Sequence, residues 1–213
     1  MIRAIIFDFG NVLEIPPDPQ EMLAQRAAVA AHFGMTAEAL WNYLFTSEAW
    51  QKAKRGQISE QQFWQEVFAT LGVTDPAQVR ALKDQLLAFK GHVPPLMRAL
   101  LRRLHHHYRL AVLSNTADPY LDRLLTEELG LHGLFDVIVS SAAEGMAKPE
   151  EAIYRLALER LGVRPEETLF IDDMERNTQA AAALGMQTIT FTTPEALQAE
   201  LLRRGLLDAP VSP

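Results

Sequence analysis

The alternation of short apolar runs with helical segments constrains the fold more than any other feature of this chain. An early run at 2–7 is rich in β-branched and aromatic residues and ends at Asp8. Four later runs are separated from one another by segments with helical periodicity: 110–113, 137–140, 168–171 and 187–191. Short apolar runs bounded by turn residues are typical of buried strands. Strands that alternate with helices form a parallel sheet with right-handed crossovers. We therefore predict an α/β fold, a Rossmann-like parallel sheet flanked by helices.

The connection between the first two predicted strands is far too long for a simple crossover. About a hundred residues lie between them, whereas a crossover needs ~10–12. This stretch is helical in pattern and includes a capping box at Ser59, where a Gln follows three residues later. We expect an α/β core of residues 1–17 and 92–213 and an inserted helical cap of residues 18–91. Because the insertion follows Asp8 closely, the cap should lie over that end of the sheet.

Turn and capping residues also predict where the helices of the core begin and end. Prolines mark helix starts and glycines or charged residues mark helix ends. The expected helices are 94–107, 118–129, 149–161, 175–184 and 194–204. A loop is expected from Ala143 to Lys148. In the cap, the helix that starts at Asp75 should carry Phe89 on its apolar face.

Composition excludes several classes of protein. The chain has 213 residues, of which 48% are hydrophobic, so it can bury a substantial core. A net charge of −7 argues against a nucleic-acid binder, which needs a basic surface, but does not exclude small anionic substrates. The absence of cysteine excludes disulfides and thiolate catalysis. No apolar run approaches the ~20 residues of a membrane span, and no signal peptide is evident. We expect a cytoplasmic protein without a membrane partner, and its oligomeric state stays open.

All three tryptophans and many other aromatic residues lie in the predicted cap. Trp41, Trp50 and Trp64 recur among apolar positions with helical spacing. We interpret these residues as a small helical core rather than an aromatic ligand cage, although one or two side chains could still face a substrate.

Polar residues follow four of the predicted strands, at the point where each strand or its loop ends. They are Asp8, Ser114, Asn115, Lys148, Asp172 and Asp173. In a parallel sheet the carboxyl ends of the strands lie at one edge, where α/β proteins bind their ligands. Three carboxylates gathered there repel one another unless a cation neutralises them. Mg²⁺ prefers oxygen ligands and accepts carboxylates together with a phosphate oxygen. A Ser hydroxyl, a backbone N–H and a Lys would bind phosphate, and an Asp can form an acyl-phosphate.

These four segments together resemble the motifs of the haloacid dehalogenase-like hydrolases. The segments are 7–13 (Phe-Asp-Phe-Gly-Asn-Val-Leu), 113–116, 145–150 and 170–177, and the resemblance covers nearly the whole chain. The cap is similar to those of the subgroup with bacterial glucose-1-phosphate phosphatase and the N-terminal phosphatase domain of soluble epoxide hydrolase.

The resemblance assigns a role to each polar residue in the motifs. Asp8 would be the nucleophile, and Lys148 would neutralise Asp8 and the transferring group. Ser114 and the backbone of Asn115 would hold the phosphate. Asn177 would either orient the acidic loop or lie on a helix surface.

The resemblance also implies a metal site. Asp173 is implied as the metal-binding acid, together with Asp8 and the backbone carbonyl of Gly10. Asp172 would be either a further ligand or a support for Asp173.

Gly10 departs from the family pattern. Most phosphatases of the family carry a second Asp at that position as general acid and base. Such help is typically worth 10²–10⁴-fold in rate. Glu14, Asp18 or His32 could replace it, although each is typical of a solvated surface. A sugar 1-phosphate would need less help because its leaving group is better.

Three functions follow from these residues. The leading hypothesis is a Mg²⁺-dependent phosphomonoesterase that acts on a small phosphorylated metabolite, of the sugar phosphate type, through an aspartyl-phosphate. The second is a 2-haloacid dehalogenase, in which Asp8 attacks carbon and no metal is needed. The third is a weakly catalytic phosphate-binding or regulatory protein, suggested by Gly10. The Asp172–Asp173 pair favours the first.

Overall fold

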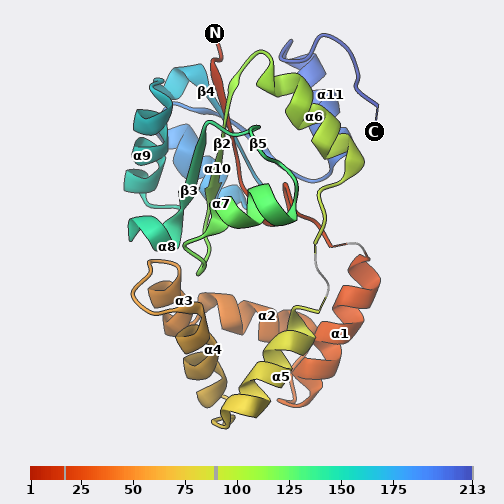
Figure 1. The fold of residues 1–213 in the computed structure, drawn as a ribbon, viewed down its shortest axis with the longest axis vertical. Coiled ribbons are helices and arrows are strands. Elements are labelled where there is room, and N and C mark those ends of the chain that lie inside the picture. Colours follow the sequence, from red (N-terminus) through yellow and green to blue (C-terminus); the bar gives the residue numbers. More distant parts are fainter. Residues whose placement is uncertain (17, 89–90, 213) are drawn as a thin grey trace.

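A five-stranded parallel sheet forms the centre of one half of the molecule (Figure 1). The computed structural model describes residues 1–16, 18–88 and 91–212. The strands are β1 (Ala4–Phe7), β2 (Arg109–Ser114), β3 (Val137–Ser140), β4 (Thr168–Asp172) and β5 (Gln187–Thr190). Their order across the sheet is β3-β2-β1-β4-β5, so β1 is the central strand. The predicted Rossmann-like α/β fold is confirmed.

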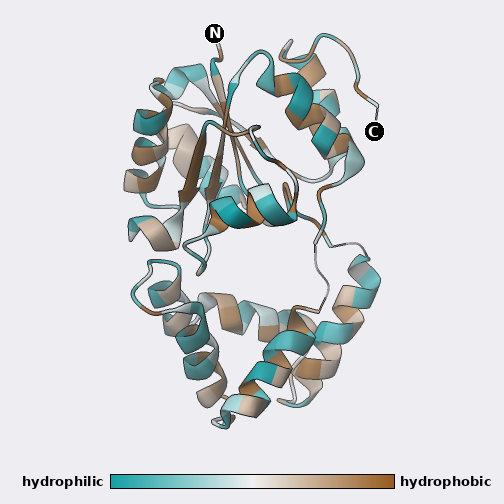
Figure 2. Cartoon of the chain, viewed as in Figure 1, coloured by the Kyte–Doolittle hydropathy of each residue, from teal (hydrophilic) through white to brown (hydrophobic). Residues whose placement is uncertain are grey.

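Helices cover both faces of this sheet, so its central strand is buried on both sides and consists of apolar residues. Ile5 and Phe7 of β1 belong to the same buried cluster as α6 and α11, whereas Ala4 and Ile6 face the cluster of α9 and α10. All four side chains are completely buried. A strand buried on both faces reads as a continuous apolar run rather than an alternating one, which is the pattern seen in the sequence. Figure 2 shows the apolar strands enclosed between the helices.

Within the described residues, six α-helices belong to this half of the molecule. They are α6 (Pro95–His105), α7 (Leu121–Arg123), α8 (Ser141–Glu144), α9 (Glu151–Leu161), α10 (Glu175–Ala183) and α11 (Pro194–Arg203). No helix within the described ranges combines the length and apolarity needed to cross a bilayer.

Two core elements differ from the sequence prediction. The helix expected at 118–129 is a short α7 followed by a π-helical turn, Leu124–Glu128. The loop expected from Ala143 to Lys148 overlaps α8, a single helical turn that ends at Gly145 in the left-handed conformation (φ +71°). Such short elements have too few residues for a periodic pattern, so sequence periodicity does not reveal them.

Five further helices face the carboxyl edge of the sheet (Figure 1). They are α1 (Pro19–Ala31), α2 (Ala37–Thr46), α3 (Glu48–Ala53), α4 (Glu60–Ala69) and α5 (Pro76–Leu86). They surround an apolar cluster of their own, which includes Leu44, Phe63 and Phe68. Burying one such side chain contributes roughly 1.5–3 kcal/mol. The predicted capping box at Ser59 starts α4.

The two connections between these helices and the sheet lie side by side. Ile15 and His92 form an isolated antiparallel bridge, with N–H···O distances of 3.0 Å from Ile15 and 2.9 Å from His92. The predicted boundary at residue 17 and the predicted apolar position Phe89 lie outside the described residues.

Candidate active site

The strand register brings the predicted polar residues to one edge of the sheet. Phe7 pairs with Val112 of β2 and with Ile171 of β4. Asp8 therefore follows β1 at the level where β4 ends in Asp172, and β2 ends two residues beyond Val112, at Ser114. Ser114 is also buried. The convergence expected of parallel strands thus occurs at their carboxyl ends.

Asp8 is held in one orientation by two donors. Its side chain is largely buried, with 8% of the residue exposed. Its Oδ1 accepts a hydrogen bond from the Phe9 N–H at 2.7 Å and lies 2.8 Å from Lys148 Nζ. No hydrogen bond or ion pair among the described residues involves Oδ2. This arrangement fixes the carboxylate and leaves one oxygen open.

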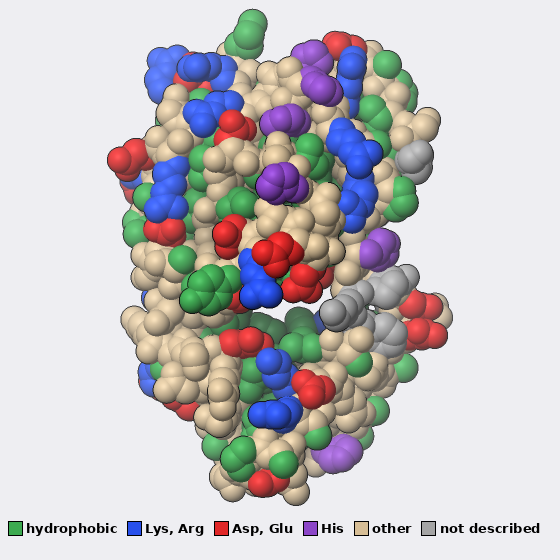
Figure 3. All heavy atoms as spheres, viewed as in Figure 1, with side chains coloured by type: hydrophobic (Ala, Val, Ile, Leu, Met, Phe, Trp, Pro, Cys, Tyr) green, Lys and Arg blue, Asp and Glu red, His purple; other side chains and the backbone are tan. Residues whose placement is uncertain are grey.

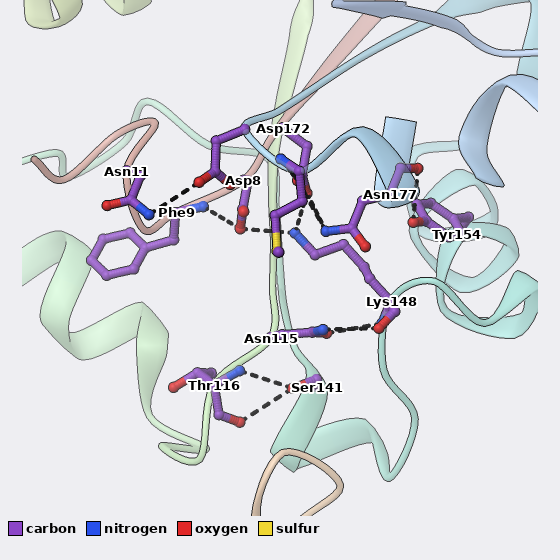
Figure 4. Close-up of polar contacts among 12 residues, drawn as sticks. Asp8, Phe9, Asn11, Asn115, Thr116, Ser141, Lys148, Tyr154, Asp172 and Asn177 are labelled. Carbon is purple, nitrogen blue, oxygen red and sulfur yellow. Dashed lines mark hydrogen bonds and ion pairs between the residues drawn. The ribbon is translucent and has the colours of Figure 1, made fainter. Parts of the chain in front are cut away.

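Lys148 is a buried cation shared by two carboxylates (Figure 4). Only 1% of it is exposed, and its Nζ lies 2.6 Å from Asp172 Oδ2 as well as 2.8 Å from Asp8 Oδ1. Burial lowers the pKa of Lys148, but Asp8 and Asp172 outweigh that effect and raise it. Burial raises the pKa of Asp8, and the charge of Lys148 opposes this. The lysine is therefore a permanent positive charge at the centre of the site.

Asn115 positions the segment that carries Lys148. Its Nδ2 donates to the Lys148 carbonyl at 2.9 Å, and its Oδ1 accepts from the Lys148 N–H at 2.8 Å. Next to it, the Thr116 N–H donates to Ser141 Oγ at 3.0 Å, so the loop after β2 is also tied to α8. Both polar atoms of the Asn115 side chain are thus bound to the Lys148 main chain. The main chain of Asn115 is the part that could contact a phosphate.

Asp172 is completely buried and uses both carboxylate oxygens. Oδ1 accepts from the Met174 N–H at 2.8 Å and from Asn177 Nδ2 at 2.9 Å, while Oδ2 contacts Lys148. The side chain of Asn177 is buried and contacts the acidic loop. Of the two alternatives expected for Asn177, this matches orientation of the acidic loop rather than a place on a helix surface. The Tyr154 hydroxyl donates to the Asn177 carbonyl at 3.1 Å and holds that helix start in place.

Asp173 is the more open of the two adjacent acids. It is half-buried, and its Oδ2 accepts from Asn11 Nδ2 at 3.0 Å. Burial raises the pKa of Asp173, whereas the Asn11 hydrogen bond lowers it. Sequence reasoning missed the role of Asn11. A possible signal was its place in a turn, because Asn tolerates the left-handed conformation it adopts here (φ 59°).

The three acids form a group suited to a divalent cation. Asp8, Asp172 and Asp173 each offer a carboxylate oxygen, and these oxygens lie within 4.8 Å of one another. When ionised, three carboxylates and Lys148 leave a local charge of −2, which a divalent ion balances. Oxygen donors of this kind match the preference of Mg²⁺. The residues therefore fit a hard divalent metal.

Gly10 lies beside these acids with open space around it. It lines the cavity described below. A Cβ built on Gly10 would meet nothing within 4 Å, and its backbone is not in the left-handed region. A Cβ at this position would therefore be accommodated.

Of the suggested substitutes for the missing acid, two are tied to α1, whereas the main chain of Glu14 pairs with Gly10. Asp18 caps α1 by accepting from the N–H groups of Gln20 and Glu21. His32 is exposed and bonds through Nδ1 to a carbonyl within α1. Burial raises the pKa of Glu14, with a further contribution from Glu128. Within the described residues, no recorded hydrogen bond or ion pair links Glu14, Asp18 or His32 to Asp8.

The helical segment touches the sheet half near this site. Arg55 forms an ion pair with Glu150, which follows Lys148 and Pro149. Gly56 lies so close to α8 that a Cβ would stand 2.2 Å from the Ala142 carbonyl oxygen. Figure 3 shows charged side chains on both sides of the narrowed region between the two halves.

Lys54 is a second residue that sequence reasoning missed. It is only 7% exposed. Burial lowers the pKa of Lys54, and the nearby charges of Arg55 and Arg176 lower it further. Glu150, the ion-pair partner of Arg55, opposes these two effects. The helical periodicity of the segment around Lys54 does not indicate that this lysine is buried.

A cavity of about 300 Å³ separates the carboxyl edge of the sheet from the helical segment. Its lining includes Phe9 and Gly10 after β1, Ser114 and Asn115 after β2, and aromatic residues of α2, α3 and α4. Ligands of α/β proteins bind at such an edge.

Comparison with known proteins agrees with this arrangement. The model of the haloacid dehalogenase-like hydrolase family matches residues 2–185. The chain is 27% identical over 201 residues to glyceraldehyde 3-phosphate phosphatase of Methanopyrus kandleri, covering 89% of this chain and 83% of the relative. It is also 27% identical over 203 residues to (S)-2-haloacid dehalogenase 4A of Burkholderia cepacia, covering 88% and 82%.

A solved structure has a similar fold. It is the magnesium complex of the HAD family enzyme bt-2542 from Bacteroides thetaiotaomicron, with a TM-score of 0.67 and 25% identity over 90% of this chain and 93% of that one. Two other curated relatives are much longer, and the chain spans 6% of one and 36% of the other.

The chain belongs to the haloacid dehalogenase-like hydrolase family. The family resemblance inferred from the four motifs is thereby confirmed.

Proposed function

We propose that the protein is a Mg²⁺-dependent phosphomonoesterase that acts through an aspartyl-phosphate on Asp8. The observation that carries this proposal is the fixed Asp8 carboxylate, which has one oxygen bound by Phe9 and Lys148 and the other open. An activated carboxylate is a known covalent nucleophile. The similarity to a phosphatase supports the choice of phosphorus as the atom attacked.

The reaction would proceed in two displacements. Asp8 Oδ2 attacks the phosphorus, the ester P–O bond breaks, and the departing alkoxide takes up a proton from solvent. Water then attacks the phosphorus, the P–O bond to Asp8 Oδ2 breaks, and the water gives its proton back to solvent, which releases inorganic phosphate and restores the carboxylate. Lys148 keeps Asp8 oriented and balances negative charge in both steps. Ser114 and the Asn115 main chain would bind the phosphate oxygens.

Magnesium would be held by Asp8, Asp173 and the Gly10 carbonyl, with Asp172 as a further carboxylate. Both Asp172 oxygens already accept hydrogen bonds or ion pairs, so its part would be mainly to support Asp173 and Lys148. A bound divalent ion supplies positive charge that stabilises the transferring phosphoryl group. The acidic group and the magnesium complex of a structural neighbour support this choice of ion.

We also propose that residues 18–91 act as a cap, with residues 1–17 and 92–213 as the core. Helices α1–α5 have an apolar cluster of their own and lie over the carboxyl edge of the sheet. A cap in this place would exclude water from the reaction and select the substrate, a small phosphate ester.

Phosphate release tests this function directly. We expect Mg²⁺-dependent hydrolysis of p-nitrophenyl phosphate or another phosphomonoester, abolished by EDTA and restored by Mg²⁺. Asp8→Asn should lower the rate by roughly 10⁴-fold or more. The exposed Asp122→Asn is the matched control and should keep the activity. Full activity of Asp8→Asn, or no release from any phosphoester despite Mg²⁺ binding, would overturn the proposal and favour a phosphate-binding protein.

A haloacid dehalogenase is the second candidate, supported by Gly10 and the similarity to the Burkholderia enzyme. Gly10→Asp separates the two, because a Cβ at this position meets no atom within 4 Å and the backbone is outside the left-handed region. In a phosphatase, the added acid should raise phosphate release by roughly 10²–10⁴-fold. Metal-independent halide release from 2-haloacids, unaffected by this change, would instead support the dehalogenase.

A further inference from the structure

The cavity above the carboxyl edge has two unlike walls. One wall is formed by the loops after β1 and β2. The other is formed by the helical segment and consists of Phe45, Trp50, Glu60, Phe63, Trp64 and Leu87. Five of these six side chains are apolar or aromatic, so the composition of the second wall bears on what the cavity can bind.

The aromatic side chains of that wall support one another. Trp50 contacts Phe45 edge-on at a centroid distance of 4.9 Å and Phe63 at 5.6 Å. Phe63 in turn lies 4.8 Å from Trp64. Phe63 and Trp64 are buried, whereas Leu87 is 40% exposed. Such ring pairs are stable in edge-to-face geometry, and the wall is therefore a fixed apolar surface.

One oxygen of the charged residue of that wall is bound by its neighbours. Glu60 Oε1 accepts from Trp64 Nε1 at 3.1 Å and forms an ion pair with Lys83 at 2.8 Å. Glu60 is the one ionisable side chain that the described part of the helical segment contributes to the cavity. Its Oε2 has no recorded partner among the described residues, so this wall offers a substrate hydroxyl one charged acceptor.

Most polar groups of the opposite wall are also engaged. The Asn115 amide is paired with the Lys148 main chain. Thr116 Oγ1 accepts from the Asp118 N–H, and Asp118 Oδ1 accepts from the Tyr120 N–H. The Ser114 hydroxyl has no recorded partner among the described residues, and it lies where the phosphate would bind. Among the described residues, Asp118 Oδ2 and Glu60 Oε2 also have no recorded partner, so these two carboxylate oxygens are open acceptors away from the phosphate end.

We infer that the alcohol part of the substrate is an apolar hydrocarbon group rather than a sugar. This inference rests on the proposed phosphatase function and names the substrate class of the same site. A sugar ring placed against this wall would find a charged acceptor in Glu60 alone and would bury most of its hydroxyls against apolar side chains, which is costly. A hydrocarbon chain or ring gains free energy when it leaves water for the same surface. The cavity of about 300 Å³ is at the small end of ligand pockets, so the group is compact.

A homologous series of substrates tests the inference. We would measure kcat/KM for n-alkyl phosphates of increasing length beside glucose 1-phosphate, glucose 6-phosphate and glycerol phosphate. Burial of each methylene should raise kcat/KM about fourfold until the cavity is full. The best alkyl phosphate should exceed each polyol phosphate by at least about tenfold. A flat series, or a preference for a sugar phosphate, would overturn the inference while leaving the phosphatase function intact.

A matched pair of variants locates the effect in the cavity. Leu87→Asn places an amide on the apolar wall, whereas Leu23→Asn makes the same change on α1 away from the cavity. Both leucines are exposed, at 40% and 56%, so both variants should fold. Leu87→Asn should lower kcat/KM for the longest good alkyl phosphate at least about fivefold and leave that for methyl phosphate unchanged, while Leu23→Asn changes neither.

The outcomes separate this inference from the proposed function. Equal losses for long and methyl phosphates in Leu87→Asn, or no loss for either, would contradict the apolar wall as a substrate contact. Absence of Mg²⁺-dependent hydrolysis of every phosphoester would instead overturn the phosphatase function itself, and the inference with it.

Discussion

Charged side chains are buried together at the carboxyl edge of the sheet, whereas aromatic side chains are packed together in the helical segment opposite. At the sheet edge, Lys148 joins Asp8 and Asp172, and each group depends on its partners. In the helical segment, Phe63 and Phe68 are held by apolar packing, without charged partners. A buried ion network fails when one member is removed, while an apolar cluster weakens with the volume removed. The two regions should therefore respond differently to substitution.

The largest effect should come from breaking the ion network. Lys148→Met leaves two buried carboxylates without a cation, so we expect a loss of about 3–5 kcal/mol in the free energy of unfolding and loss of activity. Urea denaturation measures the first and phosphate release the second. Adding Asp172→Asn to this variant should recover much of the stability but none of the activity. Equal stability of Lys148→Met and the parent protein would show that the network does not hold the edge together.

A cavity in the aromatic cluster should weaken the helical segment alone. Phe68 is completely buried and stacks near Phe33 and Trp64, so Phe68→Ala should cost about 3–5 kcal/mol. All three tryptophans lie in this segment, so tryptophan fluorescence should report unfolding at lower urea than circular dichroism. Phe170→Ala makes a similar cavity under the sheet and should not advance the fluorescence transition. Coincident transitions in Phe68→Ala would mean that the two regions unfold as one.

The contact between the two regions can be perturbed with a matched pair of glycines. Gly56 and Gly34 both have φ +65°, but only at Gly56 would a Cβ clash, at 2.2 Å from the Ala142 carbonyl oxygen. Gly56→Ala should therefore lower kcat/KM by about tenfold, since overpacking costs roughly 1–3 kcal/mol. Gly34→Ala shares the backbone strain and should lose some stability but keep its activity. The prediction fails if both variants lose activity equally.

The smallest effect is expected for an exposed ion network. Hydrogen bonds from Arg203 and then Arg204 lower the pKa of Glu200 from 4.5 to about 2. A lowered folded-state pKa stabilises the fold above pH 4.5, and this contribution is lost as the pH falls toward 2. Glu200→Gln should lower Tm at pH 7 by roughly 1–2 °C. The difference from the parent protein should shrink between pH 4.5 and 2 in a thermal melt; a constant difference would contradict the assignment.

The sequence predicts where the strands of the site end, because each strand end follows from a local pattern of apolar and polar residues. The positions of Asp8, Ser114 and Asp172 follow from apolar runs that end in polar residues, and their convergence follows from a parallel sheet. The structure confirms the strands and the sheet. The catalytic roles of these residues stay predictions, because geometry alone does not test them.

Hydrogen bonds between side chains and groups far apart in the sequence could not be predicted. The Asn11–Asp173 and Asn115–Lys148 hydrogen bonds join residues from different loops, and no local pattern specifies them. The sequence pattern predicts that the aromatic residues of the helical segment form a core. Phe68 does lie in such a core, whereas Trp50 and Phe45 also line a cavity. Helical periodicity shows that a face is apolar and does not show whether it meets another helix or a ligand.

The bridge between Ile15 and His92 has a consequence for how this protein can vary. Because the two connections meet, the ends of the 76-residue segment between them are held together as the ends of a hairpin loop are. A change in the length of that segment can therefore leave the spacing of its two attachment points unchanged. A change at Arg55 or Gly56 instead alters a direct contact with the sheet half.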